Sequence, residues 1–282
     1  MNASYQLTPP SSGLASCVRG YVSRSTAQGA PAQKTHFPAA LTCAITWFIE
    51  GRSSLLQQAS RLTGQTGQPS QPQPVVFHGP RTQAQVSEDR GPVQSFMVLL
   101  MPDAVRAMAG LDMAAHVNRI STMTEAFDVA WHRMAQAVLE APDDALRIQL
   151  VEAFLEPRWR AVCEQGQHQV KRYQDWVQDL SLRAQAHGVG RSMRQAQRRI
   201  KEWAGMSLRQ LQGIVRIESA LAQVKECIAK GQLDWSRIAS DNGFSDQAHF
   251  CREIRRISGM SPTELRRAVD EDEGFWLYRI LN

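Results

Sequence analysis

An internal repeat in the last third of the chain limits the possible folds more than any other feature. Residues 192–211 match residues 246–265 at an offset of 54. Two copies of one unit, a helix followed by a glycine and a second helix, are the simplest explanation. The coinciding residues are Arg198 with Arg252, Ile200 with Ile254, Leu211 with Leu265, and Gly205-Met206-Ser207 with Gly259-Met260-Ser261.

The repeated Gly-Met-Ser segment predicts where one helix ends and the next begins. Gly205 and Gly259 suit a helix end, because the left-handed conformation costs glycine little. Ser207 and Ser261 are placed to cap the following helix, with Gln or Glu three residues later as a capping box requires. The last third of the chain is therefore predicted to be all-α.

The helix before each of these glycines is predicted to be amphipathic. Its apolar residues recur three or four positions apart, which places them on one side of a helix. The predicted buried face comprises Met193, Ala196, Ile200 and Trp203 in the first copy and Phe250, Ile254 and Ile257 in the second.

The opposite faces of the two helices carry side chains suited to reading DNA. Arg can bind guanine and Gln can bind adenine through paired hydrogen bonds, while further cations neutralise phosphates. Residues 233–245 add the short helix and glycine turn that precede the recognition helix of a helix-turn-helix. A solvated helix face is the alternative for either copy alone, but two matching faces favour DNA. The outward residues are Arg194, Gln197, Arg198 and Lys201 in the first copy and Ala248, Cys251, Arg252 and Arg255 in the second.

The charge of the chain supports a separate DNA-binding region. The net charge is +5, yet residues 166–269 hold 18 Lys and Arg against 10 Asp and Glu. A basic region beside a mildly acidic body is typical of a nucleic-acid-binding module attached to another domain. We therefore predict an N-terminal effector or regulatory domain at 1–165, a DNA-binding domain at 166–269 and a C-terminal tail at 270–282.

The second copy resembles the AraC/XylS family of bacterial transcription regulators. The matching pattern is an Ala, a Gly-aromatic pair, an Asp-Gln-x-His-Phe run, an Arg and a closing Gly-x-Ser-Pro. The resemblance covers residues 177–268, although the first copy departs from it at Gly188-Val-Gly-Arg-Ser192 and at Ala196, where Leu is common. The residues that carry it are Ala239, Gly243-Phe244, Asp246-Gln247-Ala248-His249-Phe250, Arg252 and Gly259-Met260-Ser261-Pro262.

The resemblance implies how the two units would meet DNA. One long helix, Leu208 to Lys230, would link them, and they would enter successive major-groove segments about 34 Å apart. The base-facing residues that it implies are Arg194, Gln197 and Arg198 in the first unit and Gln247, Ala248, His249, Cys251 and Arg252 in the second.

The first 110 residues are predicted to be mainly strands, and the following segment to be helical. Residues 41–49, 75–77 and 93–101 are rich in β-branched and aromatic residues between Pro and Gly. The whole chain is thus α+β, with a β-rich N-terminal domain that is cupin-like or related, followed by helices and two helix-turn-helix units. Helices are predicted at 102–110, 124–140 and 142–163, and a mobile surface loop at 57–74.

Three roles for the N-terminal domain remain open at this stage. It could bind an effector that alters DNA affinity, or serve only in oligomerisation through Trp131, Phe154 and Trp159. A metal-dependent cupin-type enzyme would need His36 and His78, which lack neighbouring ligand motifs. We therefore predict no catalytic residue, no metal and no cofactor.

Composition narrows the cellular setting and the partners. No run of 18 apolar residues appears, and the five cysteines are scattered, which favours reduced thiols in a cytoplasmic protein. Double-stranded DNA is the predicted partner, and no membrane is expected. A small-molecule effector, RNA polymerase and a second copy of the chain are further candidate partners.

Overall fold

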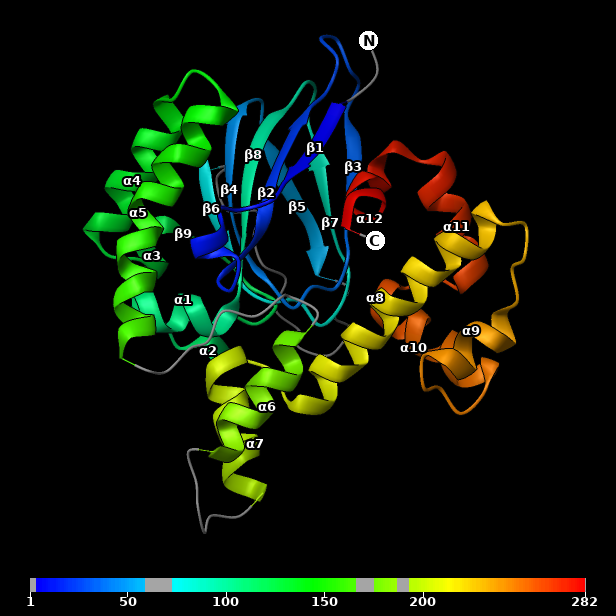
Figure 1. Ribbon diagram of the computed structural model, residues 1–282. Helices are drawn as coiled ribbons and strands as arrows, with labels where there is room; N and C mark the ends of the chain where they lie inside the picture. Colours follow the sequence, from blue (N-terminus) through cyan, green and yellow to red (C-terminus); the bar gives the residue numbers. More distant parts are fainter. Residues whose placement is uncertain (1–3, 59–72, 166–174, 187–192, 282) are drawn as a thin grey trace.

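The computed structural model describes residues 4–58, 73–165, 175–186 and 193–281. Two antiparallel sheets form the N-terminal domain, with helices on its outer side (Figure 1). The larger sheet consists, in spatial order, of β1 (Ser4–Thr8), β2 (Val18–Ser25), β8 (Gln94–Leu100), β4 (Cys43–Glu50), β6 (Val75–His78) and β9 (Ile120–Thr122). The smaller sheet consists of β3 (Gln33–Phe37), β7 (Gln85–Asp89) and β5 (Ser53–Gln58).

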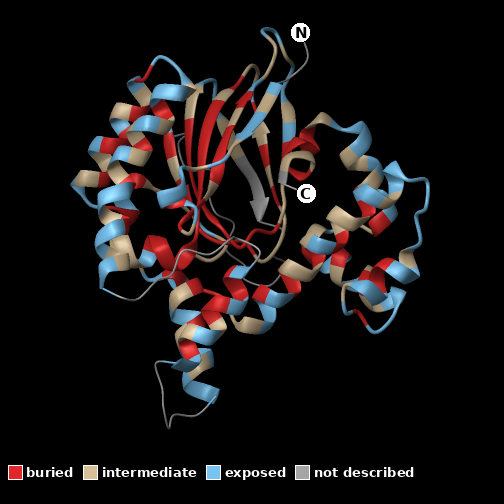
Figure 2. Ribbon diagram, in the orientation of Figure 1, coloured by how far each residue is buried: buried red, intermediate tan, exposed pale blue. Residues whose placement is uncertain are grey.

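Helices cover one face of the larger sheet, and the buried residues of that sheet and those helices form one apolar core (Figure 2). The indole N–H of Trp47 on β4 donates to the carbonyl of Ala135 at 2.9 Å, which ties the sheet to the helical layer. A short 3-10 helix, η1 (Ser12–Leu14), joins β1 to β2. The helices are α1 (Pro102–Ala109), α2 (Met113–His116), α3 (Met123–Ala126), α4 (Val129–Glu140) and α5 (Asp144–Glu164).

The other face of the larger sheet meets the smaller sheet through a buried ion pair. Arg24 on β2 reaches Asp89 on β7 at 2.6 Å, and both side chains are almost fully buried. Thr35 on β3 donates to the same carboxylate at 2.8 Å. The Arg24–Asp89 pair and the stacking of Phe37 on His78 hold the small sheet against the large one.

The C-terminal region is helical throughout its described residues. One long helix, α8, separates the two repeated units (Figure 1). The elements are α6 (Trp176–Ala186), α7 (Met193–Ala204), α8 (Leu208–Ala229), α9 (Trp235–Asp241), α10 (Gln247–Ser258), α11 (Pro262–Glu271), η3 (Glu273–Phe275) and α12 (Trp276–Leu281).

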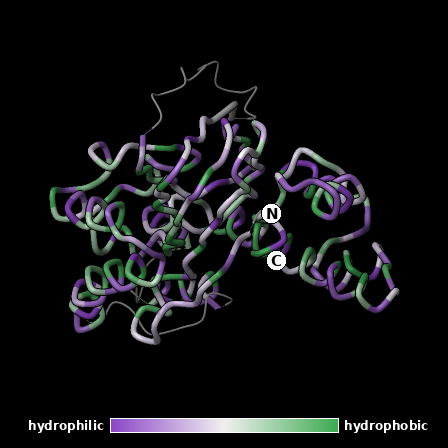
Figure 3. Tube along the Cα trace, turned by 90° about the horizontal axis from the view of Figure 1, so that it is seen from above, coloured by the Kyte–Doolittle hydropathy of each residue, from purple (hydrophilic) through white to green (hydrophobic). Residues whose placement is uncertain are grey.

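The C-terminal segment returns to the N-terminal domain and packs against its sheets. Trp276 and Leu277 are 2% and 1% exposed and join an apolar cluster with residues of β2, β4 and β8. The Phe275 ring stacks on His36 of β3 with centroids 4.1 Å apart, and Arg24 lies over the Trp276 ring. Viewed from above, the C-terminal end lies between the N-terminal domain and the second unit (Figure 3).

Most predicted elements of the N-terminal domain are present, with shifted bounds. The strands at 41–49, 75–77 and 93–101 correspond to β4, β6 and β8. The predicted helix 124–140 is instead two helices, α3 and α4. Asp128 interrupts the predicted helix and caps α4 by accepting the backbone N–H groups of Ala130 and Trp131. The last predicted helix starts after its cap, Asp143, rather than at Pro142. The predicted loop overlaps β5 at Gln57 and Gln58, and residues 59–72 lie outside the described residues.

The structure tests the three aromatic residues that were considered for an oligomer interface. Trp131 and Trp159 are 1% and 2% exposed, so they belong to the core and are unavailable to a partner, while Phe154 is only partly buried.

Within the described part of the chain, no helix is both long and apolar enough to cross a membrane.

Candidate nucleic-acid interface

The second unit is a helix-turn-helix built around a buried phenylalanine. Gly243, with φ of 72°, ends the turn after α9 in the left-handed region that suits glycine. Phe244 follows it, 5% exposed, and packs edge-on against Phe250 of α10 with centroids 5.2 Å apart. Asp246 then caps α10 by accepting the backbone N–H of His249 at 2.6 Å, and this bond lowers the pKa of the Asp246 carboxyl.

α10 presents a basic face to solvent because its apolar residues point inward. Phe250, Ile254 and Ile257 are buried as predicted. His249 and Cys251 are half-buried, and the His249 ring lies 3.1 Å from the hydroxyl of Ser245, so part of its surface is used within the turn. The exposed members of the predicted set are Gln247, Ala248, Arg252 and Arg255.

α7 of the first unit has the same division with one exception. Ile200 is buried and Ala196 and Trp203 are half-buried, but Met193 is 68% exposed. The prediction that Met193 belongs to the buried face is wrong, because it is the first residue of the helix and lies beyond the packed surface. The predicted outward residues Arg194, Gln197, Arg198 and Lys201 are all exposed.

The repeat in sequence is also a repeat in structure. α7 and α10 each span 12 residues and start 54 positions apart, and the helices that follow them, α8 and α11, are offset equally. Gly205 and Gly259 have φ of 75° and 80°, and Ser207 and Ser261 each head a complete capping box. The predicted glycine ends and serine caps are therefore confirmed in both units.

The long helix α8 holds the turn of the second unit through polar contacts that the sequence did not reveal. Arg216 lies over the Phe244 ring and donates to the carbonyl of Gly243 at 3.3 Å. Gln223 donates to Asp241 at 2.7 Å and accepts from Asn242 at 2.6 Å. These residues hold the turn that orients α10. Their role can be seen only in the structure, in which α8 lies against this turn.

The first unit is held by the N-terminal domain. Asp103 of α1, 5% exposed, accepts from the Trp176 indole at 2.8 Å and from the Arg183 guanidinium at 2.5 Å, and both partners lie on α6. Gly205 packs so closely on α2 that an added Cβ would lie 2.7 Å from the carbonyl of Met113. Residues 187–192, between α6 and α7, lie outside the described residues.

The two histidines considered for an enzyme lie against aromatic rings. His36 stacks on Phe275, and His78 stacks on Phe37 with its pKa lowered to about 3 by burial and by Arg81. Among the residues that the structure describes, no three His, Cys, Asp or Glu side chains gather as metal ligands would.

Comparisons with known proteins agree with this geometry. Residues 185–268 match a family model described as a helix-turn-helix domain. No curated protein matches the chain.

The chain is similar to two solved structures over most of its length. ToxT from Vibrio cholerae is 9% identical, covers 94% of this chain and 98% of its own, and has a TM-score of 0.38. The AraC-like transcriptional activator CuxR is 15% identical, covers 98% of this chain and 85% of its own, and has a TM-score of 0.36. The helix-turn-helix domain is therefore identified from the domain match and from the geometry of α6–α11, and not from these two structures. Residues 185–268 thus form a helix-turn-helix domain.

Proposed function

We propose that the chain is a sequence-specific regulator that reads two major-groove segments with α7 and α10. The observation that carries this proposal is the repeated exposed face, present on two helices 54 residues apart and followed by identical turns and caps. We further propose that residues 1–165 form the regulatory domain and residues 166–269 the DNA-binding domain.

The chemistry of the exposed faces assigns a role to each proposed contact residue. Arg198 and Arg252 occupy the same position in the two helices and are suited to paired hydrogen bonds with guanine. Gln197 and Gln247 suit adenine, and Ala248 suits the thymine methyl group. The remaining proposed contacts, from Arg194, Lys201, His249, Cys251 and Arg255, would go to phosphates or to neighbouring base edges.

Selection of bound duplexes from a random DNA library tests the proposal directly. The full chain is expected to enrich one motif with two blocks about 10 base pairs apart. On that motif, Arg198→Ala and Arg252→Ala should each weaken binding by about 1–3 kcal/mol and relax specificity in one block. Arg160→Ala, on the exposed surface of α5, is the matched control and should bind as the parent does. Binding that shows no sequence preference and only weakens with salt would contradict the proposal.

We also propose that an effector acts through the N-terminal domain. Support comes from the direct packing of that domain on both units, through Asp103 to α6 and through the C-terminal segment after α11. A change in the N-terminal domain would thus alter the placement of both reading helices. RNA polymerase and a second copy of the chain remain proposed partners.

A further inference from the structure

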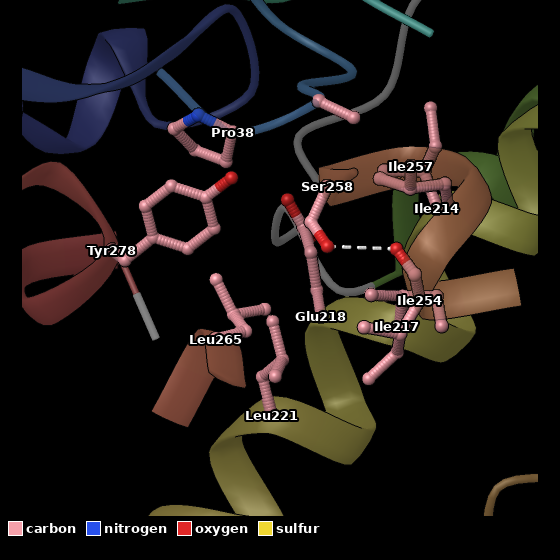
Figure 4. A pocket seen from close by; sticks show the side chains of 11 residues that line it. Pro38, Ile214, Ile217, Glu218, Leu221, Ile254, Ile257, Ser258, Leu265 and Tyr278 are labelled. Atoms are coloured by element: carbon pink, nitrogen blue, oxygen red, sulfur yellow. Dashed lines mark hydrogen bonds between the residues drawn. The ribbon is translucent and has the colours of Figure 1, made fainter. Parts of the chain in front are cut away.

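Met193 has the most exposed large apolar side chain in the part of the chain that the structure describes, at 68%. It is the first residue of α7. Apolar residues of the other reading helix are covered instead: Ile254 and Ile257 are 0% and 5% exposed and lie beside two isoleucines of α8 (Figure 4). The apolar surface of Met193 is therefore open to a partner.

The position of Met193 in the repeat says more than its exposure, since single exposed apolar residues are common on protein surfaces. Val129, the first residue of α4, is also 62% exposed. Met193, however, lies 54 residues before Gln247, the exposed first residue of α10. It therefore occupies in α7 the place that a proposed DNA contact occupies in α10.

The neighbours of Met193 on α7 belong to the proposed reading face. Arg194 follows it directly, and Gln197 lies one helical turn later on the same side; both are exposed. Side chains of an α-helix lean toward its N-terminus, so the Gln197 side chain is directed toward the turn that holds Met193. The N-terminal residues of a recognition helix are those that reach base edges. Met193 is therefore placed beside the base that Gln197 is suited to read.

The chemistry of the major groove indicates what an apolar side chain would contact there. Gln pairs with adenine, and the thymine opposite that adenine carries a C5-methyl group, which apolar side chains recognise. Methionine is unbranched and flexible, so it adapts to irregular apolar contacts. We propose that Met193 contacts the thymine C5-methyl group in the base pair that Gln197 reads or in the pair beside it. This assignment rests on the proposed function and adds the identity of one base to it.

Replacing thymine by uracil tests the assignment, because uracil pairs as thymine does and lacks only the methyl group. On the motif that the full chain enriches, the first block is the one in which Arg198→Ala relaxes specificity. Each thymine of that block is replaced in turn, and binding is measured at one salt concentration. The parent should bind one of these duplexes about fourfold more weakly, the value of one methyl-sized apolar group left in water. Met193→Ala should weaken binding of the thymine duplex and bind the two duplexes equally.

Two controls locate the effect. Val129→Ala removes a side chain of similar exposure from the first position of another helix and should keep the preference for thymine. Met193→Ala should leave any thymine preference in the second block unchanged, and should unfold as the parent does because the side chain is exposed.

The possible failures are distinguishable. A first block without thymine, a parent that binds every uracil duplex as tightly as the thymine duplex, or a preference that persists in Met193→Ala would overturn the assignment and leave the two-block reader intact. If the library enriched no motif, the proposed function and this assignment would both be wrong.

Discussion

The two helix-turn-helix units are near copies in local structure, yet the N-terminal domain holds them by different means. The first unit is held by polar contacts, with Asp103 between the Trp176 indole and the Arg183 guanidinium. The second is held by an aromatic segment, in which Phe275 and Trp276 follow α11 and pack on the sheets. A repeated pattern therefore fixes the fold of each unit, while residues outside the repeat decide how each unit is restrained.

The difference follows from the ends of the repeat. α6 precedes the first unit and lies against α1. Its Trp176 and Arg183 therefore contact Asp103, at the start of α1. The second unit is followed by residues 272–281, which have no counterpart after the first because α8 continues there instead. The following substitutions test whether the two attachments are independent.

The largest effect is expected from Trp276→Ala. Removing a fully buried indole from the cluster on β2, β4 and β8 should lower the free energy of unfolding by about 4 kcal/mol. Hydrogen exchange should show lost protection in η3 and α12 and retained protection in α6. Trp235→Ala, a half-buried position within the second unit, is the control and should leave α12 protected. Equal loss of protection in α6 and α12 would show that the two attachments are one cooperative unit.

A somewhat smaller effect is expected from Asp103→Ala. The substitution removes one acceptor from the half-buried Arg183 guanidinium and one from the Trp176 indole N–H, and should cost about 3 kcal/mol. Loss of protection should now appear in α6 and α7 rather than in α12. Asp112→Ala, which removes only the exposed cap of α2, should cost about 1 kcal/mol and serves as the comparison.

The contrast also shows what a sequence of this kind can predict. Patterns that act within a few residues were sufficient for the glycine ends, the serine caps and most of the exposed residues of α7 and α10. Contacts between distant segments were not accessible in this way: nothing in the pattern around Asp103 or Arg216 indicates a partner 80 or 27 positions away. The place of the apolar residues after Asp270 on the sheets likewise depends on the strand pairing.

β2 shows the same limit within the N-terminal domain. Arg24 occupies an inward-facing position of this strand and is paired with Asp89 on the opposite sheet. A charged residue at that position weakens the alternation of apolar and polar residues by which strands are recognised. The strand was therefore missed, and the buried pair that joins the two sheets was missed with it.

The equivalent glycines offer a matched test with a smaller effect. Both have positive φ, so Gly259→Ala should cost about 1 kcal/mol from backbone strain alone. Gly205→Ala should cost about 2 kcal/mol more, because its Cβ would lie 2.7 Å from the Met113 carbonyl, whereas nothing lies within 4 Å of Gly259. Thermal or denaturant unfolding of the two variants measures the difference. Equal losses would mean that the first unit does not press on α2 in solution.

The smallest effect expected is a pH dependence confined to the second attachment. Burial lowers the pKa of His36, and Lys34 adds to this while Asp272 opposes it. Because the folded pKa lies below the unfolded value, the neutral ring stabilises the docked segment above about pH 6.5, and this contribution is lost as the pH falls. Protection of η3 and α12 in hydrogen exchange, corrected for the intrinsic rate, should therefore decrease from pH 8 to pH 5 relative to that of α6.

His36→Phe separates this effect from other titrating groups. Phenylalanine keeps an aromatic ring against Phe275 but carries no proton, so the additional loss in η3 and α12 at low pH should disappear. His78, with its pKa lowered to about 3 by burial and Arg81, stays neutral in both folded proteins over this range, so its contribution cancels in the comparison. If the variant and the parent lose protection equally, the acid sensitivity originates within the sheets and not at the attachment of the second unit.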